Sequence, residues 1–214
     1  MTNFKLIKLL HALPTPCDLN AVEIGIERWR SAIRNSGNDN QNNLTEIGEA
    51  ILREPKSRDL LEAIFGNSFY LSQCVITDPY FFCNLLSSDP NDVAMMIMRD
   101  LKNKRDSFSS DKELMQSLRI AKRQMSLTIA IADIGEVWNL EKITRQLSEF
   151  ADLTLSLTAS YLLRVSASQG ALKLKNKNDP EKDSGLIIIG MGKLGAFELN
   201  YSSDIDLIIL YDTK

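Results

Sequence analysis

Two aspartates near the end of the chain, Asp204 and Asp206, carry the side chains best suited to chemistry. They flank Ile205 and lie at the mouth of an apolar run that is predicted to form a strand. In a strand, side chains at positions i and i+2 project from one face, about 6.5–7 Å apart, so the carboxylates should point together while Ile205 points into the core. Carboxylates so close repel each other. Mg²⁺ would remove that repulsion, because it takes one or two carboxylates together with water and phosphate oxygens.

A glycine-rich segment upstream supplies groups that suit a phosphate. Gly190, Gly192 and Gly195 allow backbone to come close to a phosphate, and the following short helix offers unpaired N–H groups at its start. Lys193 can neutralise a phosphate oxygen as a point charge. The segment is therefore interpreted as a phosphate-binding turn.

Two serines, Ser202 and Ser203, connect this turn to the aspartates. Their hydroxyls can hydrogen-bond a phosphate or hold the metal-binding loop. Glu198 and Asn200, placed within the short helix, can support the site from behind. The combination of a glycine turn, a lysine, two serines and paired aspartates predicts metal-dependent nucleotidyl transfer. In that chemistry two Mg²⁺ ions activate the attacking oxygen and stabilise the leaving one.

Other interpretations of the same residues are open. The glycines also satisfy the G-x-G-x-x-G dinucleotide fingerprint, with Asp212 about 20 residues on as a ribose-binding acid. The short helix leaves little room for a parallel crossover, and this interpretation gives Asp204 and Asp206 no role. A P-loop is excluded, because Leu194 rather than Ser or Thr follows Lys193. Plain turn and capping chemistry is the structural alternative.

The elements that must position these residues are mostly helical. Residues 1–172 are predicted to form a helical region, residues 173–184 a charged connector, and residues 185–214 an incomplete strand, turn, short helix and strand. The expected strands are a buried-type one over 186–189 and a second over 206–211. The fold class is α+β, mostly α: a helical bundle that leads into the start of a nucleotidyltransferase-type α/β core.

Apolar spacing supports the helices of that bundle. One face of a long helix carries apolar or aromatic residues at three- and four-residue steps, with Thr154 at the one weak step: Ile143, Leu147, Phe150, Leu157 and Tyr161. Asp89 followed by Pro90 marks the start of another helix, because aspartate caps and proline suits the first turn. Its methionines, Met95, Met96 and Met98, are expected to pack in the core.

Composition excludes several classes of partner. The formal net charge is −3 and is spread along the chain, so nucleic acid is a poor candidate. No apolar run approaches the roughly 20 residues of a membrane span, and the N-terminal segment is expected to be an amphipathic helix that ends before Pro14. Three scattered cysteines and one histidine form no zinc-ligand spacing, so a structural zinc site is not expected. Cysteines that are scattered and odd in number favour a reduced, cytoplasmic location.

The segment "GMGKLGAFELNYSSDIDLIILY" (residues 190–211) closely resembles the signature of the glutamine synthetase adenylyltransferase family. Upstream, "IFGNSFYLSQCVITDP" (residues 64–79), "LRIAKRQMSLTIAIADI" (118–134) and "ITRQLSEFAD" (143–152) are similar to the N-terminal half of that family. Its members are bifunctional enzymes that attach AMP to, and remove it from, a tyrosine of bacterial glutamine synthetase. Their aspartate motif is shared with the wider DNA polymerase β-like nucleotidyltransferase superfamily.

The resemblance implies a function in nitrogen regulation. The "ELN..SDIDL" form is similar to the AMP-removing half, which implies phosphorolysis: phosphate attacks the AMP–tyrosine bond and ADP leaves. By matching positions, Asp204 and Asp206 are implied as catalytic metal ligands, and Gly192, Lys193 and Ser203 as part of the phosphate-binding turn. The implied ligands and partners are Mg²⁺, ATP or ADP, phosphate, glutamine synthetase and, in the full-length family, a PII-type signalling protein.

Family members are several times longer and supply a third acidic ligand on a later strand, which is absent from this chain. The chain is therefore expected to be a truncated form (a gene remnant, a split-gene product or a fragment) with little or no activity of its own. The alternative function is not enzymatic: the chain would be a non-catalytic helical module that binds glutamine synthetase or a complementing chain.

Overall fold

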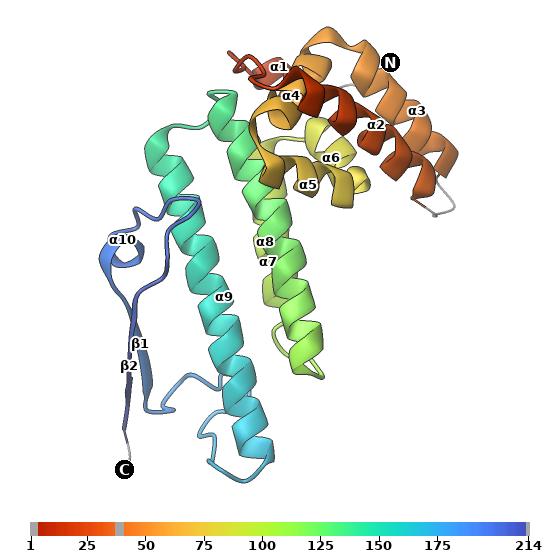
Figure 1. Ribbon diagram of the computed structural model, residues 1–214. Coiled ribbons are helices and arrows are strands. Elements are labelled where there is room, and N and C mark those ends of the chain that lie inside the picture. The colour runs from red at the N-terminus through yellow and green to blue at the C-terminus, as the bar shows by residue number, and fades with distance from the viewer. Residues whose placement is uncertain (1–3, 37–40, 213–214) are drawn as a thin grey trace. The chain divides into compact units, whose positions relative to one another are not determined.

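The computed structural model describes residues 4–36 and 41–212, and it is a mostly helical α+β fold (Figure 1). Its described elements follow one another along the chain in the order α1 (Lys5–Leu9), α2 (Leu19–Asn35), α3 (Gln41–Arg53), α4 (Pro55–Asn67), α5 (Phe69–Thr77), α6 (Pro79–Leu86), α7 (Pro90–Asn103), α8 (Asp111–Ile134), α9 (Leu140–Ser168), β1 (Leu186–Gly190), α10 (Gly192–Gly195) and β2 (Leu207–Tyr211). The predicted fold class is confirmed.

The chain divides into two compact units. Unit 1 comprises Met1–Met95 and Arg123–Trp138, and unit 2 comprises Met96–Lys122 and Asn139–Lys214. The boundaries between the units fall within α7, within α8 and just before α9. The two strands and α10 belong to unit 2.

Unit 1 is built around an aromatic core in which α2 packs against α3, α4 and α5. Trp29 and Phe82 are completely buried, with ring centroids 5.3 Å apart in an edge-to-face arrangement. Gly25 of α2 lies directly over Phe65 of α4, where a Cβ atom would come within 2.3 Å of the ring. A side chain at Gly25 would therefore force the two helices apart.

Side-chain caps start the helices of unit 1. Asp18 accepts a hydrogen bond from the Ala21 amide at 2.9 Å, and Asp78 accepts one from the Phe81 amide at 3.1 Å. These caps satisfy N–H groups that have no partner in the first turn of a helix. The predicted start at Pro90 is confirmed as the first residue of α7.

The methionines of α7 differ from expectation. Met95 and Met96 are exposed, at 62 % and 41 %, rather than packed in the core. Val93, Ala94, Ile97 and Leu101 take the buried face instead. The helix is amphipathic, and Met95 and Met96 fall on its outer side because other aliphatic residues already complete the inner one, whereas Met98 is half-buried.

Unit 2 is organised by α9. The predicted apolar face is confirmed at Ile143, Phe150, Leu157 and Tyr161, which are all buried. The Tyr161 hydroxyl donates a 2.7 Å hydrogen bond to Asp111 at the start of α8. This bond joins the two helices where the tyrosine ring leaves the core.

The segment after α9 is tied to the helices. Arg105 donates hydrogen bonds to Asp179 at 3.2 Å, to Glu181 at 2.8 Å and to Ser160 of α9 at 2.7 Å. Ser156 and Ser160 also donate to Glu181. Residues 173–184 contain no helix or strand, and these contacts fix their second half against α9.

The sheet of unit 2 consists of β1 and β2, which pair antiparallel from Leu186↔Tyr211 to Gly190↔Leu207. Ile187 and Ile189 are 54 % and 41 % exposed, and Ile208, Ile209 and Leu210 are all more than two-fifths exposed. The prediction of a buried strand over 186–189 is therefore wrong for Ile187 and Ile189, because within the described chain no second layer covers that surface. β2 also begins at Leu207, one residue after the predicted start.

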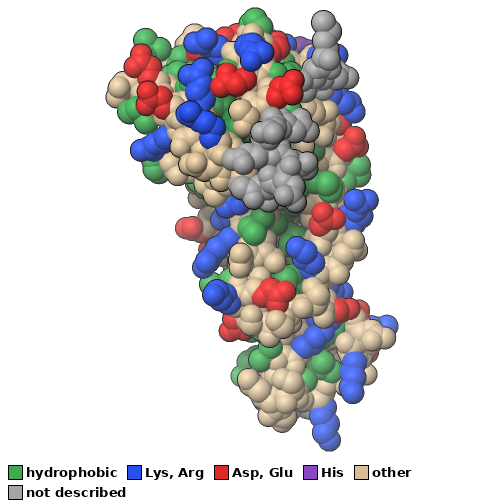
Figure 2. Space-filling view, turned by 90° about the vertical axis from the view of Figure 1, so that its right-hand side faces the viewer, with side chains coloured by type: hydrophobic (Ala, Val, Ile, Leu, Met, Phe, Trp, Pro, Cys, Tyr) green, Lys and Arg blue, Asp and Glu red, His purple; other side chains and the backbone are tan. Residues whose placement is uncertain are grey.

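No helix in the described part of the chain has the length and hydropathy that a bilayer crossing requires. On the face shown in Figure 2, acidic and basic side chains are interspersed rather than gathered by sign. That face therefore lacks the single-sign field that typifies a nucleic-acid interface.

Candidate functional site

The glycine turn between β1 and β2 is tightly closed. Gly192 has a φ of +52°, the left-handed region that favours glycine. A Cβ atom at Gly195 would lie 2.5 Å from the Gly190 carbonyl oxygen. Both glycines are therefore required by the local fold, since one supplies an unusual backbone angle and the other a close approach.

The turn is anchored on α9 by two leucines. Leu194 of α10 and Leu199 beyond it are 3 % and 6 % exposed, and they pack with Ala151 of α9. Leu147, Leu155 and Leu207 surround this small cluster. Phe197 lies between the two leucines with a φ of +58°, a strained conformation for a bulky residue. The long helix thus fixes the position of the turn.

A buried serine completes this anchor. The Leu199 amide donates a 3.2 Å hydrogen bond to Ser148 Oγ, which itself donates to the Thr144 carbonyl at 2.9 Å. Ser148 is fully buried. Sequence reasoning missed Ser148, although one signal was present: it lies beside Leu147 and one turn before Ala151 and Asp152, on a face otherwise suited to apolar packing.

Asp206 lies beside the glycine turn. Its carbonyl oxygen accepts a 2.9 Å hydrogen bond from the Met191 amide, which extends the strand pairing by one step. A Cβ atom built on Gly192 would lie 3.8 Å from Asp206 Oδ2. The carboxylate of Asp206 therefore faces the backbone that is predicted to receive a phosphate.

Asp204 and Ile205 precede the strand rather than belong to it. Residues 203–206 have no regular secondary structure, and Asp204 and Asp206 are both exposed. Ile205 is 40 % exposed, so the prediction that it points into the core is wrong. The strand begins only where Leu207 meets the leucine cluster, and so two-residue alternation does not apply to the aspartates.

The remaining predicted residues take different positions. Lys193 is exposed on α10, with its side chain available to solvent. Ser202 is exposed in a turn, whereas Ser203 Oγ donates a 2.5 Å hydrogen bond to Asn200 Oδ1. Asn200 therefore shapes the loop before the aspartates. Glu198 and Asn200 lie beyond α10, which ends at Gly195, and not within the helix as predicted.

The strand pairing contradicts the dinucleotide interpretation. That fingerprint requires parallel strands joined by a crossover helix, but β1 and β2 are antiparallel. Asp212 also lies at the opposite end of the sheet from the glycine turn, where its amide donates a 3.0 Å hydrogen bond to the Gly185 carbonyl. The carboxylate near the turn is that of Asp206.

The donor set fits Mg²⁺ only in part. Asp204 and Asp206 offer carboxylate oxygens, the ligand type that Mg²⁺ prefers alongside water and phosphate. Within residues 4–36 and 41–212, no three His, Cys, Asp or Glu side chains come together as a metal site. Of the two predicted ligands, Asp206 is the one whose carboxylate lies beside the glycine turn.

Sequence comparison places the chain among proteins named for the transfer of an adenylyl group. The family described as "Glutamate-ammonia ligase adenylyltransferase" matches residues 58–214, and the chain belongs to this family. The match includes every residue of the candidate site and the α9 residues that anchor it.

Three similar proteins share the name "Bifunctional glutamine synthetase adenylyltransferase/adenylyl-removing enzyme". The one from Rhodopseudomonas palustris (strain TIE-1) is 32 % identical over 189 residues, which cover 88 % of this chain and 19 % of that protein. Those from Bradyrhizobium diazoefficiens and Agrobacterium fabrum are 38 % and 37 % identical, over 77 % and 79 % of this chain and 16 % and 18 % of theirs. The chain thus spans less than a fifth of the length of these relatives.

Proposed function

We propose that residues 185–212 contribute to a metal-dependent nucleotidyl-transfer site that acts on glutamine synthetase. The observation that carries this proposal is the position of the Asp206 carboxylate against Gly192. A phosphate that enters the turn would meet backbone N–H groups from one side and the acid from the other. An acid so placed suits a cation held between carboxylate and phosphate.

The proposed reaction removes AMP from a modified tyrosine by phosphorolysis. An oxygen of inorganic phosphate forms a bond to the phosphorus of AMP, and the bond from that phosphorus to the tyrosine oxygen breaks. ADP leaves, and the tyrosine oxygen takes up a proton. The name that the relatives share covers both adenylyl transfer and adenylyl removal, and removal is the direction proposed here.

Each residue of the turn has a proposed task in this reaction. Amides at the start of α10 would donate to phosphate oxygens, and Lys193 would balance their charge. Asp204 and Asp206 would hold Mg²⁺, which supplies charge neutralisation at the phosphate oxygens when it is bound. Ser203 would keep the loop in shape through Asn200 rather than bind phosphate, because its hydroxyl is already engaged.

Metal binding tests the proposal without requiring turnover. Mn²⁺ can replace Mg²⁺ as the probe, and electron paramagnetic resonance reports free Mn²⁺ in the presence of ADP. We expect Asp204→Asn and Asp206→Asn each to weaken Mn²⁺ binding at least about tenfold, the loss of a charged ligand. Asp212→Asn at the far end of the sheet is the matched control and should leave it unchanged.

The same variants are then assayed for ADP release from adenylylated glutamine synthetase with phosphate. If the full chain binds Mn²⁺ equally well with and without the two aspartates, the proposed site is wrong. If Asp212→Asn has the largest effect, the acid at the opposite end of the sheet carries the binding instead.

A further inference from the structure

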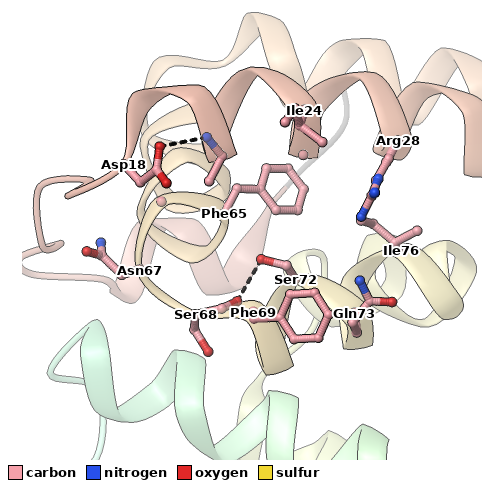
Figure 3. A pocket seen from close by; sticks show the side chains of 13 residues that line it. Asp18, Ile24, Arg28, Phe65, Asn67, Ser68, Phe69, Ser72, Gln73 and Ile76 are labelled. Atoms are coloured by element: carbon pink, nitrogen blue, oxygen red, sulfur yellow. Dashed lines mark hydrogen bonds between the residues drawn. The ribbon is translucent and has the colours of Figure 1, made fainter.

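Unit 1 contains a groove that plays no part in the proposed reaction. It has a volume of about 390 Å³ and lies between α2 and α5, with Phe65 of α4 at its base (Figure 3). α2 contributes Ile24 and Arg28, and α5 contributes Phe69 and Ile76. These residues recur at three- to seven-residue steps, so each helix turns one continuous face to the groove.

The walls of the groove are apolar and open to solvent. Phe69 is 78 % exposed and Ile24 is 42 % exposed, whereas Phe65 at the base is 4 % exposed. A single exposed apolar side chain needs no explanation, but several that line one hollow are typical of a recognition surface. An apolar group that enters the groove would cover Phe69 and Ile24 together.

Most polar groups of the groove are already used by the fold. Asp18 caps α2, and Ser68 accepts a 3.2 Å hydrogen bond from the Leu71 amide. Ser72 donates to the Ser68 carbonyl at 2.7 Å, as Figure 3 shows. Asn67 donates to the carbonyls of Thr15 and Ala63. None of these side chains needs a ligand to complete its bonding.

Arg28 is different. Its guanidinium reaches from α2 toward Gln73 and Ile76 of α5 (Figure 3). Arg28 is exposed, and among the residues that the structure describes no carboxylate lies within ion-pair distance of it; Gln73 makes no hydrogen bond from its side-chain amide. The groove therefore has an exposed cation at one end, while Asp18 at the other end caps α2, so the Arg28 end is complementary to an apolar group that has an acid nearby.

The walls also decide the conformation of the occupant. Both walls are helices, whose interior backbone groups are bonded within each helix, so no strand edge is offered. A helical occupant suits such walls, because it satisfies its own backbone groups without a strand partner. From Asp18 to Arg28 the α2 face rises about 15 Å, which accommodates about three turns of a second helix.

We propose that this groove binds an amphipathic helix of a partner protein, which places a large apolar side chain over Phe65 and a carboxylate against Arg28. The acid lies three or four residues from the apolar anchor, on the same face of the bound helix. This interaction is independent of the nucleotidyl-transfer site and does not rely on its activity.

A displayed library of 16-residue helical peptides, panned against the full 214-residue chain, identifies what the groove prefers. We expect recovered peptides to share a large apolar residue and an acid three or four positions away. Labelled synthetic copies then give dissociation constants by fluorescence anisotropy. Arg28→Glu should weaken binding at least tenfold, and Phe69→Ala should weaken it by a similar factor.

Arg53→Glu is the matched control, because Arg53 is exposed at the end of α3 and its replacement by Glu changes the charge by the same amount. It should leave the dissociation constant unchanged. Replacing the peptide acid with lysine should restore binding to Arg28→Glu, which a folding defect in that variant would not allow. The proposal is overturned if no peptide is enriched, if the recovered peptides share no acid, or if Arg28→Glu and Arg53→Glu act alike.

Discussion

Leu194 should control the stability of the strand and turn module. Its side chain is 3 % exposed and packs with Ala151 and Leu199 in a cluster of few members. Replacement of a buried leucine by alanine costs about 2–5 kcal/mol, and the low end applies here because the surrounding leucines are only partly buried and can relax. We therefore expect Leu194→Ala to lower the free energy of opening of the module by about 2–3 kcal/mol.

Hydrogen exchange measures that loss directly. At about 1.4 kcal/mol for each factor of ten, the amides of β1 and β2 and the Met191 amide should exchange roughly 30- to 150-fold faster in Leu194→Ala. Helices of unit 1 should keep their exchange rates, since the cluster contains residues of unit 2 alone. Ile187→Ala, at a position that is 54 % exposed, should change the rates by less than about fivefold.

Two outcomes would refute this reasoning. If the strand amides exchange no faster in Leu194→Ala than in Ile187→Ala, the leucine cluster does not hold the module on α9. If unit 1 loses protection to the same degree as the strands, the cluster supports the whole chain rather than one module.

Three further predictions concern single residues. Gly195→Ala should disrupt the turn, because the new methyl group would lie 2.5 Å from the Gly190 carbonyl oxygen. The expected result is faster hydrogen exchange of the Met191 amide. Gly170→Ala is the control, because Gly170 has a φ of +77° but open space around it. Thiol titration of the native chain at pH 8 should detect one fast cysteine, the exposed Cys17, because burial raises the pKa of both Cys74 and Cys83, the latter to about 12; two or three fast thiols would contradict the buried positions. Partial desolvation, with a smaller contribution from Glu149, raises the pKa of Asp152 although this residue is exposed on α9. The ionised form is therefore disfavoured in the folded chain, and Asp152→Asn should stabilise the chain by a small amount at neutral pH. Chemical denaturation should show this advantage vanish below the ordinary aspartate value of 3.8, where the acid is protonated in both states.

The helices were largely predictable because their signals are local. Asp89 and Pro90 mark a helix start through capping and a fixed backbone angle, and both act within a single turn. The face of α9 follows from spacing alone. Met95 and Met96 were misplaced because residue type does not determine which side of an amphipathic helix meets the core.

The candidate site depended on contacts that the sequence does not show. The glycines were correctly assigned to a tight turn, since the need for glycine is local. Ile205 differs from the prediction because side chains alternate between faces only within a strand, and the strand starts at Leu207. The role of Ser148 arises from a hydrogen bond that joins residues 51 positions apart, and no local pattern predicts such a pair.

The Arg105 contacts have a consequence for limited proteolysis. The lysines at positions 173, 175 and 177 are exposed. They precede Asp179 and Glu181, the two acids to which Arg105 donates hydrogen bonds. A trypsin cut at any of these lysines would leave the C-terminal fragment hydrogen-bonded to Arg105. The fragment would also stay packed against α9 through Leu194 and Leu199. The nicked halves should therefore elute together from a sizing column and separate only in denaturant.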